Sequence, residues 1–157
     1  MTARPLISDE IADFIESGLS INVGTSSKAL EPDGVIAWAA HVHEDRSQIS
    51  IYLHKDAAQA MLRNLHVHPE IAVLFERPTN HRACQIKGTF VSTRNAKPAE
   101  QAKVAVQADR FCKELEGIGI PRALLAGLPI WPCQAVQIRA TELFEQTPGP
   151  GAGEPLR

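Results

Sequence analysis

The stretch 71–93, IAVLFERPTNHRACQIKGTFVST, constrains the fold most, because it joins an apolar run to an alternating segment through a turn. The continuous apolar run 71–75 is typical of a strand that is buried on both faces. Residues 78–80, Pro-Thr-Asn, break that pattern and predict a turn. Two strands joined by so short a turn are expected to lie antiparallel in one sheet.

Apolar and polar side chains alternate after the turn, as in a strand with two different faces. One face carries Cys84, Ile86, Gly88 and Phe90, and the other carries Gln85, Lys87, Thr89 and Val91. The second face would present Gln85 and Lys87 to a ligand or a partner. Gly88 stands where a side chain would normally pack, so we expect a close approach to the backbone there.

Alternating patterns predict three more strands before this stretch. They lie over residues 19–23, 35–43 and 48–54, with a loop rich in Gly, Ser, Pro and Asp at 24–34. Alternation along the second of these strands predicts that one face carries Ile36, Trp38, Ala40 and Val42.

Helices are predicted around the strands. Ser8 can cap a helix over 8–17, and Asp56 can cap the helix that follows the third strand. Pro98 opens the longest helix, which runs over about 98–116. The apolar stripe of that helix is predicted to consist of Ala105, Ala108, Phe111, Cys112 and Leu115.

The order of these elements predicts the fold class. A brief helical turn at Pro121 and a last strand around Val136 and Ile138 complete the chain, and the tail 147–157 lacks periodicity. Short turns between most strands imply an antiparallel sheet. About six strands with helices at the ends predict a single α+β domain over 1–146, built on a small β-barrel.

Composition excludes several classes of protein. The 157 residues suffice for one core, and 44% apolar with 22% charged residues is typical of a folded globular chain. A formal charge of −2 gives no general attraction for nucleic acid or membranes. No apolar run approaches the roughly 20 residues that span a bilayer, and no export signal is evident. Three cysteines without a CxxC pair are typical of reduced thiols, so we expect a cytoplasmic protein.

The segment MLRNLHVHPEIAVLF, with the HRACQIKGTF that follows, resembles the FMN-binding split-barrel family that includes pyridoxamine 5′-phosphate oxidase. In that family a helix ends in a phrase like N-L-x-x-N-P, a buried strand follows, and the next strand carries a glutamine and a glycine. The matching residues here are Asn64, Leu65, Pro69, Gln85 and Gly88, with His68 in place of the second Asn. The resemblance covers residues 19–91 and extends further only in the order of elements.

This resemblance implies a six-stranded antiparallel split β-barrel with flanking helices. It also implies a homodimer with two FMN sites at the subunit interface. Gln85 corresponds to a glutamine that contacts the flavin ring, and Tyr52 and His54 correspond to an aromatic-polar pair at a strand end. Trp38 stands on the strand where the oxidase carries an Arg and a Lys, and could form a wall of the flavin slot.

The phosphate of FMN would need cations or backbone N–H groups. The family's Ser-x-Lys clamp is absent near residues 59–61, and Lys55 and Arg63 could replace it. Lys87 could supply a further cation, and Arg82 could bind an anion beside the turn. Without a second cationic cluster for a substrate phosphate, oxidation of pyridoxamine phosphate itself is not implied.

Each of these residues also has a plainer interpretation. In that interpretation Lys55, Arg63 and Lys87 are solvated surface charges, Arg82 is a turn charge, and Trp38 belongs to the core. Two His-Val-His words, at 41–43 and 66–68, suggest a metal, but zinc takes three or four ligands and no carboxylate or cysteine repeats the spacing. We therefore expect exposed or interface histidines and no metal site.

We expect a flavin-dependent oxidoreductase that binds FMN and acts on an unknown small molecule. His54 and His81 are candidate general acids or bases, by reach alone. The alternative is a non-catalytic binding module of the same fold, which stores or senses a flavin or a haem, or has lost its cofactor.

Overall fold

The computed structural model describes residues 6–156. In chain order the elements are α1 (Asp9–Ile15), β1 (Ser20–Ser26), β2 (Pro32–Ala37), β3 (Ala39–Val42), β4 (Gln48–His54), α2 (Lys55–Val67), β5 (Glu70–Glu76), β6 (Ala83–Asn95), η1 (Pro98–Glu100), α3 (Gln101–Gly117), η2 (Arg122–Leu124) and β7 (Cys133–Glu145). This order is the predicted one, except that the predicted strand 35–43 is divided into β2 and β3.

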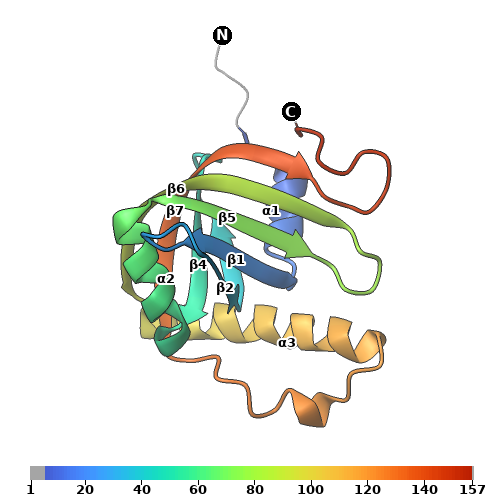
Figure 1. Cartoon of the computed structure of the whole chain (residues 1–157). Coiled ribbons are helices and arrows are strands. Elements are labelled where there is room, and N and C mark those ends of the chain that lie inside the picture. Colours follow the sequence, from blue (N-terminus) through green and yellow to red (C-terminus); the bar gives the residue numbers. More distant parts are fainter. Residues whose placement is uncertain (1–5, 157) are drawn as a thin grey trace.

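The seven strands form one antiparallel sheet in the order β2-β1-β5-β6-β7-β4-β3. Its two outer strands, β2 and β3, are consecutive in the chain and are separated by Trp38 alone. β2 pairs with β1 and β3 pairs with β4, so this connection curls the sheet into a barrel (Figure 1). The predicted split barrel is therefore confirmed, and its seventh strand arises because one predicted strand is bent.

The bend changes which way the side chains of this strand face. Trp38 and Ala39 pack outside the barrel under α3, whereas Ala37 and Ala40 lie in the barrel core. The prediction that Trp38 shares a face with Ala40 was therefore wrong. Simple alternation fails because the strand must pass from one edge of the sheet to the other at this point.

Helices α1 and α2 bury their apolar faces in the barrel core. As predicted, Ser8 caps α1, and its Oγ accepts the Ile11 N–H at 3.3 Å. The predicted cap of α2 was wrong, because His54 takes that place and its Nδ1 accepts the Asp56 N–H at 3.4 Å. β4 runs into α2 without a loop, so the last residue of the strand becomes the cap.

Helix α3 lies over the outer surface of β3, β4 and β7, below the sheet in Figure 1. Its buried face consists of Val104, Gln107, Ala108, Phe111 and Cys112. Ala105, which was predicted in the apolar stripe, is exposed. Gln107 takes a place in the buried face instead, because its side-chain amide pairs with the backbone of Ala40. The amide accepts the Ala40 N–H at 2.9 Å and donates to the Ala40 carbonyl at 2.8 Å.

The stretch 71–93 forms the antiparallel pair β5 and β6, as predicted. β5 is not buried on both faces, because Ala72 and Leu74 on its outer face are only partly buried. The close approach at Gly88 is confirmed: a Cβ there would overlap the carbonyl oxygen of Arg139 on β7 and lie 3.0 Å from the carbonyl carbon.

Two connections are more ordered than predicted. The expected loop 24–34 is reduced to the turn 27–31, because β1 and β2 pair up to Ser26 and Pro32. The tail folds back along β7, where the Leu156 N–H donates to the Leu143 carbonyl at 2.8 Å. No helix within residues 6–156 is both long and apolar enough to cross a membrane.

Candidate functional site

The predicted cofactor-binding residues fall into two main groups. The first, Gln85 and Lys87, lies on the outer face of β6. The second consists of Tyr52, His54 and Lys55, where β4 meets α2. We call these groups the β6 face and the β4–α2 junction.

Strand register separates the two groups. Gln85 lies opposite Phe144 on β7, whereas Tyr52 lies opposite Ala135 on the same strand. Positions 135 and 144 are nine residues apart, which corresponds to about 30 Å of extended strand. One copy of the chain therefore does not bring the β6 face and the β4–α2 junction together.

The β6 face is part of a wider, outward-facing row across the sheet. The residues that lie opposite one another along this row are Ile36, Asn22, Leu74, Gln85 and Phe144. Ile36 is 47% exposed, and Leu74 and Gln85 are partly buried. The helices bury their apolar sides elsewhere, so a contiguous surface with apolar and amide groups is left open.

Lys87 lies in the neighbouring row, at the edge of a shallow depression. The depression has a volume of about 250 Å³ and is lined by Gly24, Thr25, Ser26, Glu70, Ile71, Ala72 and Lys87. The Lys87 Nζ lies 5.0 Å from the centroid of the Phe144 ring. Within residues 6–156 it makes no ion pair, so its charge is available to an anion.

The β4–α2 junction holds two further cations. Lys55 starts α2 and Arg63 lies eight residues later, about 12 Å along the helix axis. Both are exposed, and in the described part of the chain neither forms an ion pair. The His54 side chain is 12% exposed. Because its Nδ1 accepts the Asp56 N–H, a neutral His54 carries its proton at Nε2.

Tyr52 is fully engaged within the protein. Its hydroxyl donates to Glu100 Oε1 at 2.9 Å, and Arg94 donates to both carboxylate oxygens at 2.7 Å. Burial, reinforced by Glu100, raises the pKa of Tyr52 to about 12. The Arg94 hydrogen bonds lower the pKa of Glu100 to about 2. Tyr52 is therefore a neutral donor that positions α3.

Sequence reasoning missed both Glu100 and Arg94. The available indication was the phrase Lys97-Pro98-Ala99-Glu100, where an acid stands three residues after a helix cap. The Glu100 carboxylate accepts the Lys97 N–H at 2.7 Å, as that phrase would predict.

Trp38 lies in the core between the barrel and α3. It is 7% exposed, and its ring centroid lies 6.4 Å from that of Phe111. In this position Trp38 supports α3, as its plainer interpretation predicts, and does not line an open surface.

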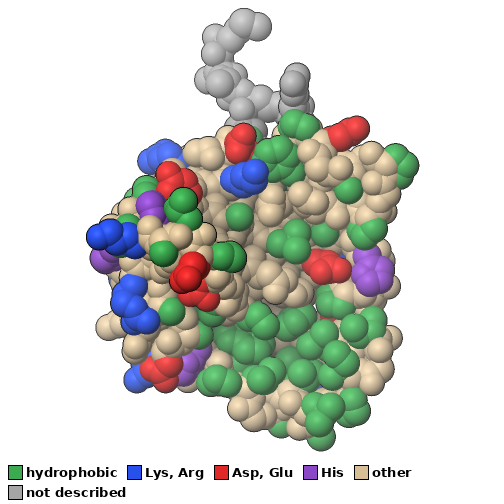
Figure 2. Space-filling view, viewed as in Figure 1, with side chains coloured by type: hydrophobic (Ala, Val, Ile, Leu, Met, Phe, Trp, Pro, Cys, Tyr) green, Lys and Arg blue, Asp and Glu red, His purple; other side chains and the backbone are tan. Residues whose placement is uncertain are grey.

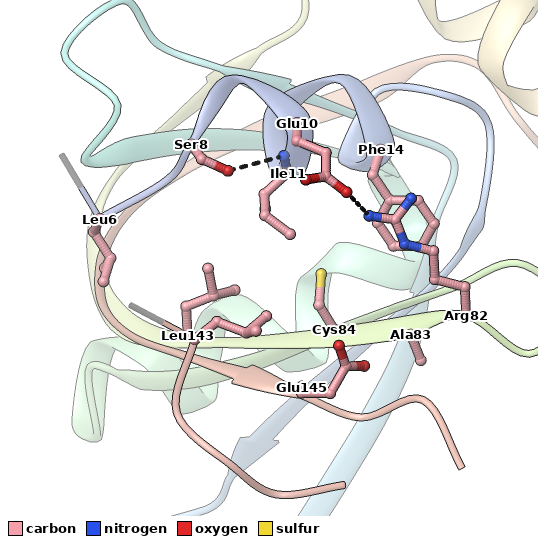
Figure 3. Close-up of a pocket in the computed structure, with 11 residues that line it drawn as sticks. Leu6, Ser8, Glu10, Ile11, Phe14, Arg82, Ala83, Cys84, Leu143 and Glu145 are labelled. Carbon is pink, nitrogen blue, oxygen red and sulfur yellow. Dashed lines mark hydrogen bonds and ion pairs between the residues drawn. The ribbon is translucent and has the colours of Figure 1, made fainter. Parts of the chain in front are cut away.

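Arg82 lines a cavity of about 230 Å³ between α1, β6, β7 and the tail (Figure 3). Its guanidinium pairs with Glu10 at 2.7 Å and lies 4.5 Å from the centroid of the Phe14 ring. The charge of Arg82 is thus already neutralised. Cys84 lines the same cavity, and burial, with a smaller contribution from Glu145, raises the pKa of its thiol to about 12. This thiol stays protonated and is a poor nucleophile.

Three other histidines lie within hydrogen-bonding distance of neighbouring side chains, whereas the buried Nε2 of His68 has no partner among residues 6–156. His41 Nδ1 lies 3.0 Å from Glu16 Oε1 and 2.9 Å from Lys103 Nζ, and His43 Nε2 lies 2.8 Å from Ser50 Oγ. His81, on the exposed turn before β6, lies 3.2 Å from Glu76. Among residues 6–156, no three His, Cys, Asp or Glu side chains converge in a way that could hold a metal.

Solved structures of other proteins match most of the chain. HupZ of Group A Streptococcus matches with a TM-score of 0.57 at 14% identity, over 94% of this chain and 99% of that chain. A candidate pyridoxamine 5′-phosphate oxidase of Lactobacillus delbrueckii matches with a TM-score of 0.56 at 11% identity, over 91% and 97%. An FMN-binding protein of Syntrophomonas wolfei matches with a TM-score of 0.54 at 9% identity, over 85% and 81%.

No protein-family model matches the chain, and no curated protein sequence matches it. At such low identities the structural likeness establishes the fold alone. The resemblance seen in the sequence is confirmed at that level. The chain has the split-barrel fold of pyridoxamine 5′-phosphate oxidase-like FMN-binding proteins, in a strongly diverged sequence.

Proposed function

We propose that the chain binds FMN, or a closely related flavin, at a site completed by two copies of the chain. The bound flavin would serve an oxidoreductase reaction on a small molecule. Structures of the same fold that are described as an FMN-binding protein and a candidate pyridoxamine 5′-phosphate oxidase support a flavin. The observation that carries the two-copy site is the distance between the β6 face and the β4–α2 junction. Residues that are expected to contact one cofactor lie too far apart in a single copy of the chain.

A second copy of the chain could bring the β6 face and the β4–α2 junction together. The row from Ile36 to Phe144 exposes apolar and amide side chains with no helix over them, which is typical of an interaction surface. A two-fold axis through this surface would place the same patch of both copies in contact. The β6 face of one copy would then approach the β4–α2 junction of the other.

The residues present fit the requirements of FMN. Lys55, Arg63 and Lys87 carry unpaired charges in the described chain that could neutralise the phosphate. Gln85 could direct a hydrogen bond at the edge of the ring, beside the apolar surface of Leu74. His54 could hold a proton at Nε2 close to the reacting molecule. A bound flavin would supply the electron-transfer chemistry itself.

Absorption spectroscopy tests this proposal. The purified protein, as isolated or after titration with FMN, should develop the two visible bands of oxidised flavin at one flavin per chain. Gel filtration should place the same sample at the mass of a dimer. A colourless protein that leaves added FMN free in equilibrium dialysis would refute flavin binding.

A non-catalytic binding module is the second candidate. α3 covers Trp38 and Tyr52, so a packed helix stands over the strand on which the resembling oxidase carries two charges. Such a module would hold its cofactor stoichiometrically, with no reduction by NADH or NADPH and no reoxidation by quinones. A Soret band on addition of haem would identify haem as the cofactor.

A further inference from the structure

We propose that the cavity between α3 and the segment 118–132 binds a small, uncharged, largely aromatic molecule. The cavity has a volume of about 380 Å³, which lies within the range of ligand pockets. None of its lining residues belongs to the β6 face or the β4–α2 junction. Binding there requires no flavin, so this proposal stands independently of the proposed function.

Apolar side chains form most of the cavity wall. From α3 they are Val104, Ala105, Ala108 and Cys112, and from the segment 118–132 they are Leu125, Ala126, Ile130 and Trp131. The three polar side chains, Gln101, Asp109 and Arg122, complete the lining. An apolar wall with a few polar groups is the arrangement that binds and orients an organic molecule.

The surface around the cavity is also unusually apolar. Leu124 is 71% exposed, Ile118 is 52% exposed and Leu128 is 41% exposed, all within the segment 118–132. Figure 2 shows hydrophobic side chains gathered over the lower part of the molecule, where α3 and this segment lie. Apart from the short turn η2, the segment has no regular structure. Leu124 directly precedes the lining residue Leu125 in the chain, so the apolar surface continues beyond the cavity wall.

Charges at the cavity select against an ion. The Arg122 guanidinium pairs with Asp109 and, at 3.2 Å, with Glu116, and Lys113 pairs with Asp109 at 3.0 Å. The Arg122 hydrogen bond lowers the pKa of Asp109, so its carboxylate stays charged. Two cations and two anions balance each other, and a charged ligand would have to displace one of these partners.

Gln101 supplies the directional contact. Among residues 6–156 its side-chain amide has no hydrogen-bond partner, and it lines the cavity at the start of α3. One donor or acceptor on an otherwise aromatic molecule would pair with this amide. Burial raises the pKa of the Cys112 thiol, so Cys112 contributes a soft apolar contact.

The uncharged fluorophore N-phenyl-1-naphthylamine is a suitable probe, because it is aromatic and carries a single N–H group. Its fluorescence should rise on titration into the purified protein and saturate at one probe per chain. Its sulfonated analogue, 1-anilinonaphthalene-8-sulfonate, should bind at least about tenfold more weakly, because the Arg122 charge is already paired. Equal or tighter binding of the sulfonate would overturn the assignment to an uncharged ligand.

Two alanines of α3 give a matched pair of variants. Ala105→Phe fills the cavity from an exposed position and should weaken probe binding at least about tenfold. Ala102→Phe makes the same change on the same helix, outside the cavity lining, and should leave probe binding unchanged. If both variants bind the probe like the unmodified protein, the cavity is not the site.

Energy transfer from Trp131 to the probe gives a second test, which does not depend on whether Ala105→Phe or Ala102→Phe folds. Excitation of tryptophan should produce probe emission by energy transfer, and Trp131→Phe should reduce that emission while direct excitation of the probe remains effective. Unchanged energy transfer would overturn the placement. Probe binding that declines with rising protein concentration would mean that a second copy of the chain occupies the cavity, and would also overturn the proposal.

Discussion

Tyr52 on β4 donates a hydrogen bond of 2.9 Å to Glu100 at the start of α3. Tyr52 is only 2% exposed, and Arg94 at the end of β6 holds the same carboxylate from the other side. Two strands and the long helix therefore meet at one carboxylate. Charge-assisted hydrogen bonds are stronger than neutral ones, so this point should hold α3 to the barrel.

Tyr52→Phe should lower the free energy of unfolding by about 1–2 kcal/mol, because it removes a hydrogen bond to a charged group and keeps the ring. Urea unfolding followed by circular dichroism measures the change. In a Glu100→Ala background the same substitution should have a much smaller effect. Strict additivity of the two changes would show that the residues do not interact.

Glu100 should also make stability depend on pH. The Arg94 hydrogen bonds lower its pKa to about 2 in the folded chain, from an ordinary value of 4.5. The folded state therefore binds fewer protons, and the stabilisation is complete above about pH 4.5 and is lost as the pH falls towards 2. Between pH 4.5 and 2, the free energy of unfolding measured with urea should fall more steeply for the unmodified protein than for Glu100→Gln. Identical pH slopes would contradict the assignment.

Gly88→Ala should destabilise the protein by about 1–3 kcal/mol, because the new Cβ would overlap the Arg139 carbonyl and separate β6 from β7. Gly34→Ala is the matched control, since its Cβ would lie 3.9 Å from the nearest atom, the Val23 carbonyl oxygen. Thermal unfolding should separate the two variants clearly. Equal melting temperatures would mean that the strands relax at no cost.

The sequence predicted features that depend on neighbours along one strand. Alternation from Cys84 onward identified β6, and the gap in it at Gly88 identified a close approach whose partner, Arg139, lies 51 residues later. The bend at Trp38 escaped prediction because the surrounding alanines fit either face of a strand. Only closure of the whole sheet determines where that strand turns.

The candidate site was harder to predict for a related reason. The sequence named Gln85 and Tyr52 together, but strand register separates them. It also left Arg82 open as an anion contact, and the partner that neutralises its charge, Glu10, is 72 residues away in the chain. Contacts between residues so far apart in the chain are set by the fold, and no local sequence pattern predicts them.

Ile36→Lys should convert the dimer that we propose into a monomer, because it places a charge on the exposed apolar side chain at the β2 end of the row from Ile36 to Phe144. Val106→Lys is the control: Val106 is 49% exposed, against 47% for Ile36, and lies on α3, outside the row from Ile36 to Phe144. Sedimentation velocity distinguishes the two species. A monomeric unmodified protein, or a dimer that persists in Ile36→Lys, would refute an interface at this surface.

Gln85→Ala and Lys55→Ala should each weaken FMN binding about tenfold, since each removes one hydrogen bond or ion pair to the cofactor. The two residues contact different parts of FMN, the ring and the phosphate, so the double variant should lose about a hundredfold. Lys28→Ala, in the turn between β1 and β2, removes another exposed lysine and should bind FMN normally. Because the phosphate contact is electrostatic, added salt should weaken binding to the unmodified protein more than to Lys55→Ala. Fluorescence titration of FMN measures the affinities of the unmodified protein and the four variants. Unchanged dissociation constants in both single variants would show that the flavin lies elsewhere.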